Sequence, residues 1–254
     1  MIAIRKPEEI EKLRRAGELV ARTLDFVESR IAPGVTTGEL DRWARELIES
    51  DGGRPAFLGY HGYPATLCVS IDDEVVHGIP GKRVVKEGMI VSVDVGAIVD
   101  GYYGDSARTF AIGKVPAQAE RLLEVTRKAL DSGIAAARPG HRIGAIGAAV
   151  SAVAEKAGFG VVRALTGHGI GTAMHEPPQI PNFGSADLGD PIEAGMVFAI
   201  EPMLNAGDYR VTFMPDGWTV KTKDGSLSAH FEHTVVVTEG TPDVLTLPAR
   251  VAHG

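Results

Sequence analysis

The chain has 254 residues, a formal net charge of −7 and a single cysteine. Hydrophobic residues make up 44% of the chain and charged residues 23%, which excludes a wholly disordered protein. The apolar runs are short and broken by glycine, and residues 1–9 are too charged for a secretory signal, so we expect neither a membrane span nor secretion. The acidic balance disfavours nucleic acid as the main partner, and the lone cysteine suits a reducing, cytoplasmic compartment.

Four helices are predicted in chain order. Pro7 is followed by two acidic residues and opens a helix that reaches about residue 29, because proline and negative charge both favour a helix start. Thr36 and Glu39 form a capping-box pattern before a second helix that ends near residue 50. Two further helices are expected over 117–137 and 141–157.

Strand patterns lie between and after these helices. Asp100-Gly101 is a strong hairpin signal between two of them. Short strands joined by tight turns favour an α+β fold with a mainly antiparallel sheet. The strands are expected over 66–71, 89–98, 102–112, 160–165, 196–203, 209–214, 217–223 and 231–238.

The chain contains an internal repeat. Two segments recur with shifts of 106 and 107 residues and a third with a shift of 127, so about 20 extra residues fall near 202–231. We interpret this as one catalytic domain, 1–254, built from two duplicated halves of about 7–113 and 114–240; chance similarity of strand patterns is the alternative. The matching pairs are Pro33–Gly38 with Pro139–Gly144, Gly88–Asp94 with Gly195–Glu201, and Asp105–Gly113 with Glu232–Gly240.

One carboxylate lies where strand interiors disfavour it. Asp94 follows Ile90–Val93 in an apolar run. If Asp100-Gly101 forms the turn, Asp94 pairs with Ala107, and Asp105 points to the same face roughly 7–8 Å away at Cα. Two like charges this close repel unless a cation or a proton lies between them. An exposed hairpin with solvated acids is the alternative.

The repeat favours a buried site over that alternative. The residues equivalent to Asp94 and Asp105 are Glu201 and Glu232, and both also lie beside apolar runs. By pseudo-symmetry the four carboxylates would face one another, which bare anions cannot do in a pocket. One or two divalent cations would remove the repulsion, and two such ions suit a hydrolytic site that generates hydroxide near neutral pH.

Histidine is the expected complement to these carboxylates. His168 lies in the glycine-rich segment Thr166–Gly171, where the backbone can approach closely, and this favours a ligand over a structural role. His77 and His175 stay open on spacing alone.

Competing catalytic motifs fail. Thr172 breaks the dinucleotide fingerprint that the glycines around His168 would otherwise suggest. Pro177 and Pro178 exclude a helical zinc-protease motif after His175. The chain contains no G-x-S-x-G elbow.

The chain strongly resembles the type I methionine aminopeptidases. Asp94, Asp105, His168, Glu201 and Glu232 match the five metal ligands of that family. The resemblance covers residues 5 to 248, is that of the short bacterial form, and implies a pita-bread fold with two pseudo-symmetric halves. The strings that carry it are Gly59–Pro64, His77–Pro80, Gly167–Gly171, Ala199–Pro202 and Phe231–Thr234.

The resemblance implies a role for each ligand. Asp94 would bind one metal, and Asp105 and Glu232 would bridge both. His168 and Glu201 would complete the other metal site, with Glu201 acting also as general base and then acid. The ions would be Co, Mn, Fe or Zn, among which the sequence does not choose.

The resemblance also implies the substrate contacts. His175 would hydrogen-bond the scissile carbonyl as charge develops, and His77 would contact the amide nitrogen or stabilise the intermediate. The pocket for the methionine side chain and the neighbouring substrate surface would be formed by Phe57, Tyr60, His61, Tyr63, Cys68, Met174 and Trp218.

The implied activity is removal of the N-terminal methionine from nascent proteins whose second residue is small. Hydroxide held by the two metals would attack the first peptide bond. The expected partners are a nascent-chain N-terminus and a transient ribosome contact, for which Lys82, Arg83 and Lys86 offer a local basic patch. A monomer is expected.

Three positions depart from the common family pattern. Gly96 replaces a frequent Thr, Met174 a frequent Phe, and His230 a frequent Gln, which leaves pocket shape and auxiliary metal contacts open. Two alternative functions remain. An X-Pro aminopeptidase or dipeptidase usually has an additional N-terminal domain, for which the residues before Asp94 leave little room. A catalytically dead binding module loses ligands, whereas this chain keeps all five.

Overall fold

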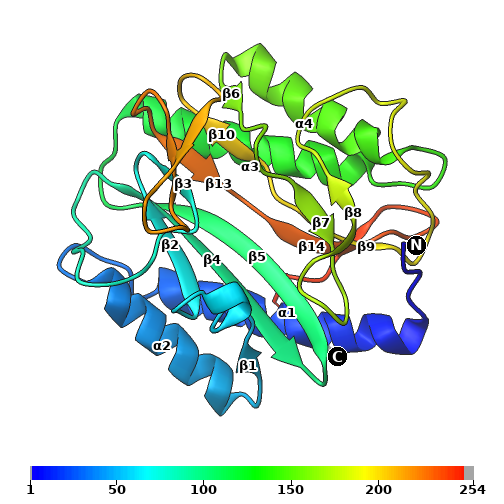
Figure 1. The fold of residues 1–254 in the computed structure, drawn as a ribbon, viewed down its shortest axis with the longest axis horizontal. Helices are drawn as coiled ribbons and strands as arrows, with labels where there is room; N and C mark the ends of the chain where they lie inside the picture. Colours follow the sequence, from blue (N-terminus) through cyan, green and yellow to red (C-terminus); the bar gives the residue numbers. More distant parts are fainter. Residues whose placement is uncertain (1, 249–254) are drawn as a thin grey trace, which may run out of the picture.

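The computed structural model describes residues 2–248 (Figure 1). Four helices and fifteen strands form in this range, with one 3₁₀ turn, η1 (Tyr60–Gly62). The helices are α1 (Pro7–Glu28), α2 (Thr37–Ser50), α3 (Ala117–Ala136) and α4 (Ile143–Ala157). The strands are β1 (Arg54–Pro55), β2 (Leu67–Ile71), β3 (Glu74–Val76), β4 (Ile90–Val99), β5 (Tyr102–Ala111), β6 (Gly160–Val161), β7 (Gly167–Gly169), β8 (Glu176–Ile180), β9 (Val197–Ile200), β10 (Met203–Asn205), β11 (Val211–Phe213), β12 (Val220–Thr222), β13 (Ser228–His230), β14 (His233–Val236) and β15 (Asp243–Val244).

All four predicted helices are confirmed, with ends that differ by at most two residues. The capping box at the start of α2 is present as predicted. The Glu39 backbone N–H donates to Thr36 Oγ1 at 3.2 Å, and the Thr36 N–H donates to Glu39 Oε2 at 2.8 Å. These bonds satisfy two of the backbone donors that a helix start leaves unpaired. None of the helices over 2–248 is long and apolar enough to cross a bilayer.

The strands form four sheets, and every strand pair among the described residues is antiparallel, as predicted. The sheet orders are β1-β4-β2 with β5 on β4, β13-β10-β6, β11-β12-β3, and β15-β14-β9-β7-β8. β1, β3, β7, β8 and β15 were not expected from the strand pattern. They have two to five residues, too few for a clear periodicity.

Two predicted strands are interrupted. The strand expected over 196–203 divides into β9 and β10 around Glu201-Pro202, because proline has no N–H to continue the ladder. In place of the strand expected over 231–238 the structure has two strands, β13 and β14, with Phe231 and Glu232 between them. β13 begins before the predicted start. Both interruptions place a predicted metal ligand beside a strand end.

The strands expected over 66–71, 89–98 and 102–112 are confirmed as β2, β4 and β5, with ends that differ by at most one residue. The other three strand predictions were too long. Of 160–165 only β6 forms, and β11 and β12 are shorter than 209–214 and 217–223. Of the apolar residues that follow β6 within this range only Val162 is buried, and its backbone N–H donates to the Met203 carbonyl at 3.1 Å, outside the ladder.

Each helix pair covers its own part of the sheets. Leu19, Val20 and Leu24 of α1 pack with Leu40 of α2 against β4 residues such as Val93. A second core joins α3 and α4 to β9, β10 and β14. In Figure 1 the strands lie between the α1–α2 pair and the α3–α4 pair.

Hydroxyl groups join β5 to the segment 230–234. Thr109 Oγ1 donates to the His230 carbonyl at 2.8 Å and accepts the His230 N–H at 2.9 Å. Thr234 Oγ1 makes the same pair of bonds with Asp105, at 2.8 and 3.1 Å. Because the residues that make these bonds are buried, the bonds fix Asp105 relative to the neighbouring Glu232.

Candidate metal centre

The hairpin of β4 and β5 carries the first two carboxylates. Its register pairs Val99 with Tyr102 and Asp94 with Ala107, which confirms the register predicted from the Asp100-Gly101 turn. Asp105 is paired with Gly96 and therefore points to the same face as Asp94.

The other three predicted ligands come from the sheet of the second half. His168 is the central residue of β7 and pairs with Ala199 of β9. Glu201 follows β9 directly and Glu232 precedes β14 directly. Because Ile200 pairs with His233, the two glutamates lie side by side just beyond the end of this ladder.

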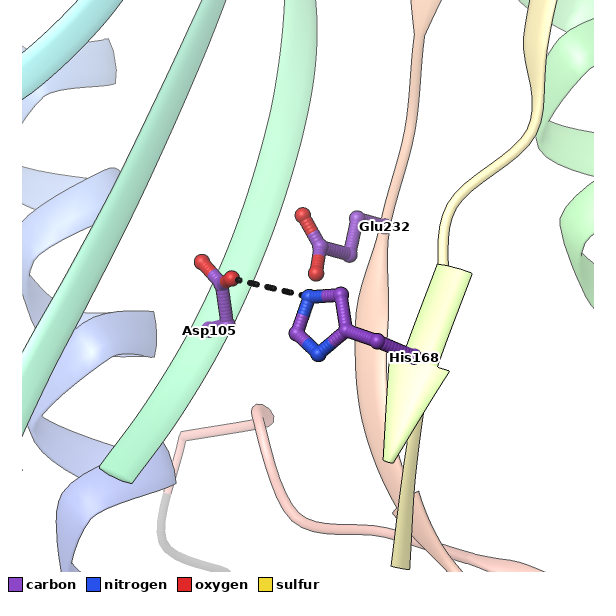
Figure 2. A group of neighbouring side chains, drawn as sticks. All are labelled: Asp105, His168 and Glu232. Carbon is purple, nitrogen blue, oxygen red and sulfur yellow. Dashed lines mark ion pairs between the residues drawn. The ribbon is translucent and has the colours of Figure 1, made fainter. Parts of the chain in front are cut away.

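The side chains from the two sheets converge. Figure 2 shows Asp105, His168 and Glu232 pointing toward one another from three different strands or strand ends. One donor atom from each of the three lies within 4.8 Å of the others. His168 Nε2 lies 3.8 Å from Asp105 Oδ2 and 3.6 Å from Glu201 Oε1.

These groups are buried without enough partners. Asp105 and Glu232 are 4% and 2% exposed. Asp94 Oδ1, Asp105 Oδ1 and Glu232 Oε1 have no hydrogen-bond partner among residues 2–248. Buried carboxylate oxygens are normally hydrogen-bonded, so three orphaned ones in a single cluster indicate that another group satisfies them.

The electrostatics lead to the same conclusion. Burial raises the pKa of Asp94 to about 7. Burial raises the pKa of Asp105, Glu201 and Glu232 as well, and the negative charges of the neighbouring carboxylates raise them further. Burial lowers the pKa of His168 to about 3, so its imidazole is neutral and free to bind a metal.

The donor set fits divalent metal ions. Four carboxylates and one neutral imidazole suit borderline divalent cations, and positive charge would remove the repulsion that now raises the carboxylate pKa values. Asp105, His168 and Glu232 alone provide three buried donors within binding reach of one ion.

A pocket of about 290 Å³ opens above these donors. Its base, the pocket floor, consists of Asp94, Asp105, His168, Glu201 and Glu232. Its side, the pocket wall, consists of Phe57, Tyr60, Tyr63, Cys68, Met174 and Trp218. His77 and His175 also line it, so every predicted site residue except His61 borders the same cavity.

The pocket wall is an apolar cluster. Tyr63 and Trp218 meet edge to face, with ring centroids 4.9 Å apart. Trp218 lies between β11 and β12, in the segment predicted as an insertion, where Asp216 accepts the backbone N–H of Trp218 and of Thr219, both at 2.9 Å. Burial raises the pKa of Cys68, so this residue is an unreactive wall component.

Two histidines border the space between floor and wall. His175 Nδ1 lies 2.7 Å from the Tyr60 hydroxyl, and the His175 ring centroid is 4.2 Å from that of His168. Burial lowers the pKa of His175, and burial lowers that of His77 to about 4. Both rings are therefore neutral at pH 7, with one N–H each to donate.

Four residues that the sequence did not assign to the site also line the cavity, whereas His61 and His230 do not. His61 is exposed beside Tyr60, with ring centroids 4.4 Å apart, and does not line the cavity. His230 is buried beneath the floor, 3.9 Å from Glu201 Oε2. The other four are apolar or small, so their only signal was closeness in sequence to His77 and His168; they are Val76, Ala164, Leu165 and Thr166.

Comparison with known proteins agrees with this geometry. Residues 11–239 match metallopeptidase family M24. The methionine aminopeptidase of Clostridium acetobutylicum is 48% identical over 248 residues, which is 97% of this chain and 99% of that protein. The crystal structure of methionine aminopeptidase from Rickettsia prowazekii superposes with a TM-score of 0.96 at 44% identity, covering 97% of this chain and all of that one.

A more distant likeness concerns the fold alone. The prolidase from Pyrococcus furiosus is 23% identical with a TM-score of 0.78, and the match covers 97% of this chain but 66% of that one. The pita-bread fold predicted from the sequence is thus confirmed. The chain belongs to metallopeptidase family M24 and, within it, to the group of the bacterial methionine aminopeptidases.

Proposed function

We propose that the chain is a methionine aminopeptidase, which hydrolyses the first peptide bond of proteins that begin with methionine and have a small second residue. The observation that carries this proposal is the meeting of two unlike surfaces in one pocket. A floor of four carboxylates and one imidazole and an apolar wall line the same cavity of about 290 Å³.

The floor would hold two divalent cations. Asp94, Asp105, His168, Glu201 and Glu232 would hold these ions. The orphaned oxygens of Asp94, Asp105 and Glu232 support this arrangement. Bound cations supply polarisation of the scissile carbonyl and a lowered pKa for the attacking water.

The wall would select and orient the substrate. A methionine side chain is long, flexible and polarizable, and it makes favourable contacts with aromatic rings and sulfur. Tyr63, Trp218 and Met174 offer such contacts, and Met174 is only 2% exposed. With the side chain in this pocket, the positively charged N-terminal amine would lie beside the carboxylates of the floor.

The remaining residues would move protons and stabilise charge. Glu201 would take the proton of the attacking water and later deliver it to the leaving amine, a role that suits its raised pKa. His175 would donate a hydrogen bond to the carbonyl oxygen as negative charge develops. His77 would contact the amide nitrogen of the same bond.

A substrate panel tests the proposal. Purified protein with added Co²⁺, Mn²⁺, Fe²⁺ or Zn²⁺ is incubated with Met-Ala-Ser, Met-Leu-Ser, Leu-Ala-Ser and Ala-Pro-Ser, and the freed amino acids are quantified. We expect rapid release of Met from Met-Ala-Ser alone. Preferential cleavage of Ala-Pro-Ser would indicate an X-Pro aminopeptidase, and no cleavage with any metal would indicate a binding module.

The cellular setting is also proposed. The enzyme would act in the cytoplasm as a monomer and contact the ribosome transiently to reach emerging chains. Lys82 and Lys86 are exposed and would contribute to this contact, whereas Arg83 is paired with Glu74 at 2.7 Å. Sedimentation with ribosomes should weaken on changing both lysines to glutamate, while Met-Ala-Ser turnover stays unchanged.

We also propose that the chain consists of two duplicated halves. In both 7–113 and 114–240 two helices precede the strands that carry the carboxylates. Asp94 and Glu201, and likewise Asp105 and Glu232, would then be equivalent residues of two related halves.

A further inference from the structure

Arg5 makes a largely buried ion pair with Glu176, a residue 171 positions later in the chain. Its Nη2 donates to the Oε2 atom of Glu176, and the two side chains are only 9% and 15% exposed. The backbone N–H of Arg5 donates to the Gly195 carbonyl at 2.8 Å, which fixes residue 5 against the segment leading into β9. In Figure 1 the N-terminal segment runs close to β9.

The other carboxylate oxygen of Glu176 binds the backbone of the loop that precedes this residue. Glu176 Oε1 accepts the backbone N–H of Thr172 at 2.8 Å and of Ala173 at 3.1 Å. The Gly171 carbonyl accepts the Tyr103 N–H at 2.9 Å, which attaches the start of the loop to β5. The loop 171–176 is thus held from β5 on one side and from Arg5 on the other.

Arg5 also explains the glycine at the start of this loop. A Cβ atom at position 171 would overlap the Arg5 guanidinium, with Nη2, Cζ and Nε as its three nearest atoms. The backbone at Gly171 therefore packs directly against the guanidinium, which leaves no room for a side chain at this position.

This loop carries two residues of the pocket. Met174 belongs to the pocket wall, and His175 reaches over the floor, with its ring 4.2 Å from that of His168. We propose that Arg5 is a positioning residue for His175: through the Glu176 carboxylate it fixes the loop that holds this imidazole at the metal centre. The inference rests on the proposed function for its effect on catalysis.

The physical reason is the cost of breaking a buried pair. Removing one partner of such a pair leaves the other charge uncompensated and is strongly destabilising locally. Without Arg5, the Glu176 carboxylate would turn toward solvent and release the Thr172 and Ala173 amides. His175 would then sample other positions, and its hydrogen bond to the scissile carbonyl would be made only part of the time. Because that bond acts as charge develops, kcat should fall more than KM rises.

A double-mutant cycle tests this coupling. Arg5→Met should lower kcat for Met-Ala-Ser about tenfold in the wild-type background and less than about twofold in a His175→Ala background, since coupled residues are not additive. Equal losses in the two backgrounds would overturn the proposal, because they would show general damage. Arg5→Lys should restore part of the loss, as lysine keeps the charge without the planar fork.

A matched control and a second readout keep the test independent of activity. Arg15→Met removes an arginine whose pair with Asp100 is exposed, and it should leave kcat within about twofold. The imidazole carbon-bound proton signals of His175, assigned from the His175→Ala spectrum, should shift in Arg5→Met and not in Arg15→Met. Unchanged His175 signals in a folded Arg5→Met protein would contradict the positioning role. Failure of the wild type to release Met would refute the proposed function and leave this spectroscopic result standing.

Discussion

The floor and the wall of one pocket differ in where their residues come from. The floor side chains belong to β4, β5 and β7 or flank the paired ends of β9 and β14, in sheets joined by buried hydroxyl bonds. The wall side chains, apart from Cys68 on β2, come from loops and turns. Groups that must keep like charges in place are thus built on paired strands, and groups that recognise a side chain are built on segments that can vary.

The floor and the wall should therefore respond differently to mutation. A change in the floor should abolish metal binding and turnover, while a change in the wall should mainly alter substrate affinity and choice. Two changes in the floor and two at the wall test this separation.

Asp105→Asn should reduce metal-dependent Met release by more than about a hundredfold. Changes in residues that only support a metal ligand already cost about 10- to 100-fold, and Asp105 is a proposed ligand. Turnover of Met-Ala-Ser and metal content after dialysis measure the effect. Asp100→Asn, at the exposed turn of the same hairpin, is the control and should stay near wild type. Near-normal activity of Asp105→Asn beside inactive metal-free controls would show that the ligand assignment is wrong.

Metal removal should make the fold sensitive to pH. Burial raises the pKa of Asp94 to about 7 in the metal-free fold, above the value of about 3.9 expected in the unfolded chain. The contribution of Asp94 to the free energy of unfolding is therefore fully present only below about pH 4. It is lost as the pH rises to about 7. The Tm gap between metal-loaded and metal-free protein should therefore widen between pH 5 and pH 7, by roughly 5 °C.

The matched control is metal-free Asp105→Asn, which has one buried acid fewer and should show a smaller pH dependence of Tm. A gap that stays constant or narrows over this range would contradict the role assigned to the floor carboxylates.

Trp218→Ala should act on the wall alone. The ring contacts Tyr63 edge to face and lies 6.5 Å from His77 between centroids, so its loss enlarges the side-chain pocket. We expect KM for Met-Ala-Ser to rise about tenfold while metal affinity stays constant, because a large apolar contact surface disappears. Steady-state kinetics and metal titration of the same sample decide this. A parallel loss of metal would mean that wall and floor are not separable.

Gly96→Thr probes a point where a strand neighbour of the floor contacts the wall. Gly96 pairs with Asp105, and a Cβ at this position would lie 2.7 Å from Phe57 Cε1 and 2.9 Å from Ala56 Cβ. The added side chain should displace the Phe57 ring and raise KM by roughly two- to fivefold, a cost typical of moderate overpacking that relaxes. Metal content should stay at the wild-type level, and its loss would show that position 96 supports Asp105 directly.

The floor was largely predictable from the sequence because it depends on local rules. A two-residue turn fixes hairpin register, and this register placed Asp94 and Asp105 on one face as observed. The helices were predictable because caps and a 3.6-residue pattern mark them. The separation between β9 and β10 was not predicted, since apolar residues lie on both sides of Glu201-Pro202 and suggested one strand.

The wall and the Arg5–Glu176 pair depend on tertiary contacts that leave no local pattern. Phe57 and Trp218 could be assigned only through the resemblance to a family, because isolated aromatic residues carry no spacing signal. The pair of Arg5 and Glu176 joins residues 171 positions apart. His61 lies outside the cavity lining although its neighbours Tyr60 and Tyr63 are part of it, and its backbone adopts a left-handed φ of 47° in η1.

The central claim is that the floor acts through bound divalent cations on a substrate held by the wall. Its most direct test is Met release from Met-Ala-Ser by wild-type protein stripped with a chelator and then titrated with Co²⁺, Mn²⁺, Fe²⁺ or Zn²⁺. The account predicts no release from the stripped protein and recovery of turnover as at least one of these ions is added. Full turnover by the stripped protein, or none with any of the four ions, would contradict it.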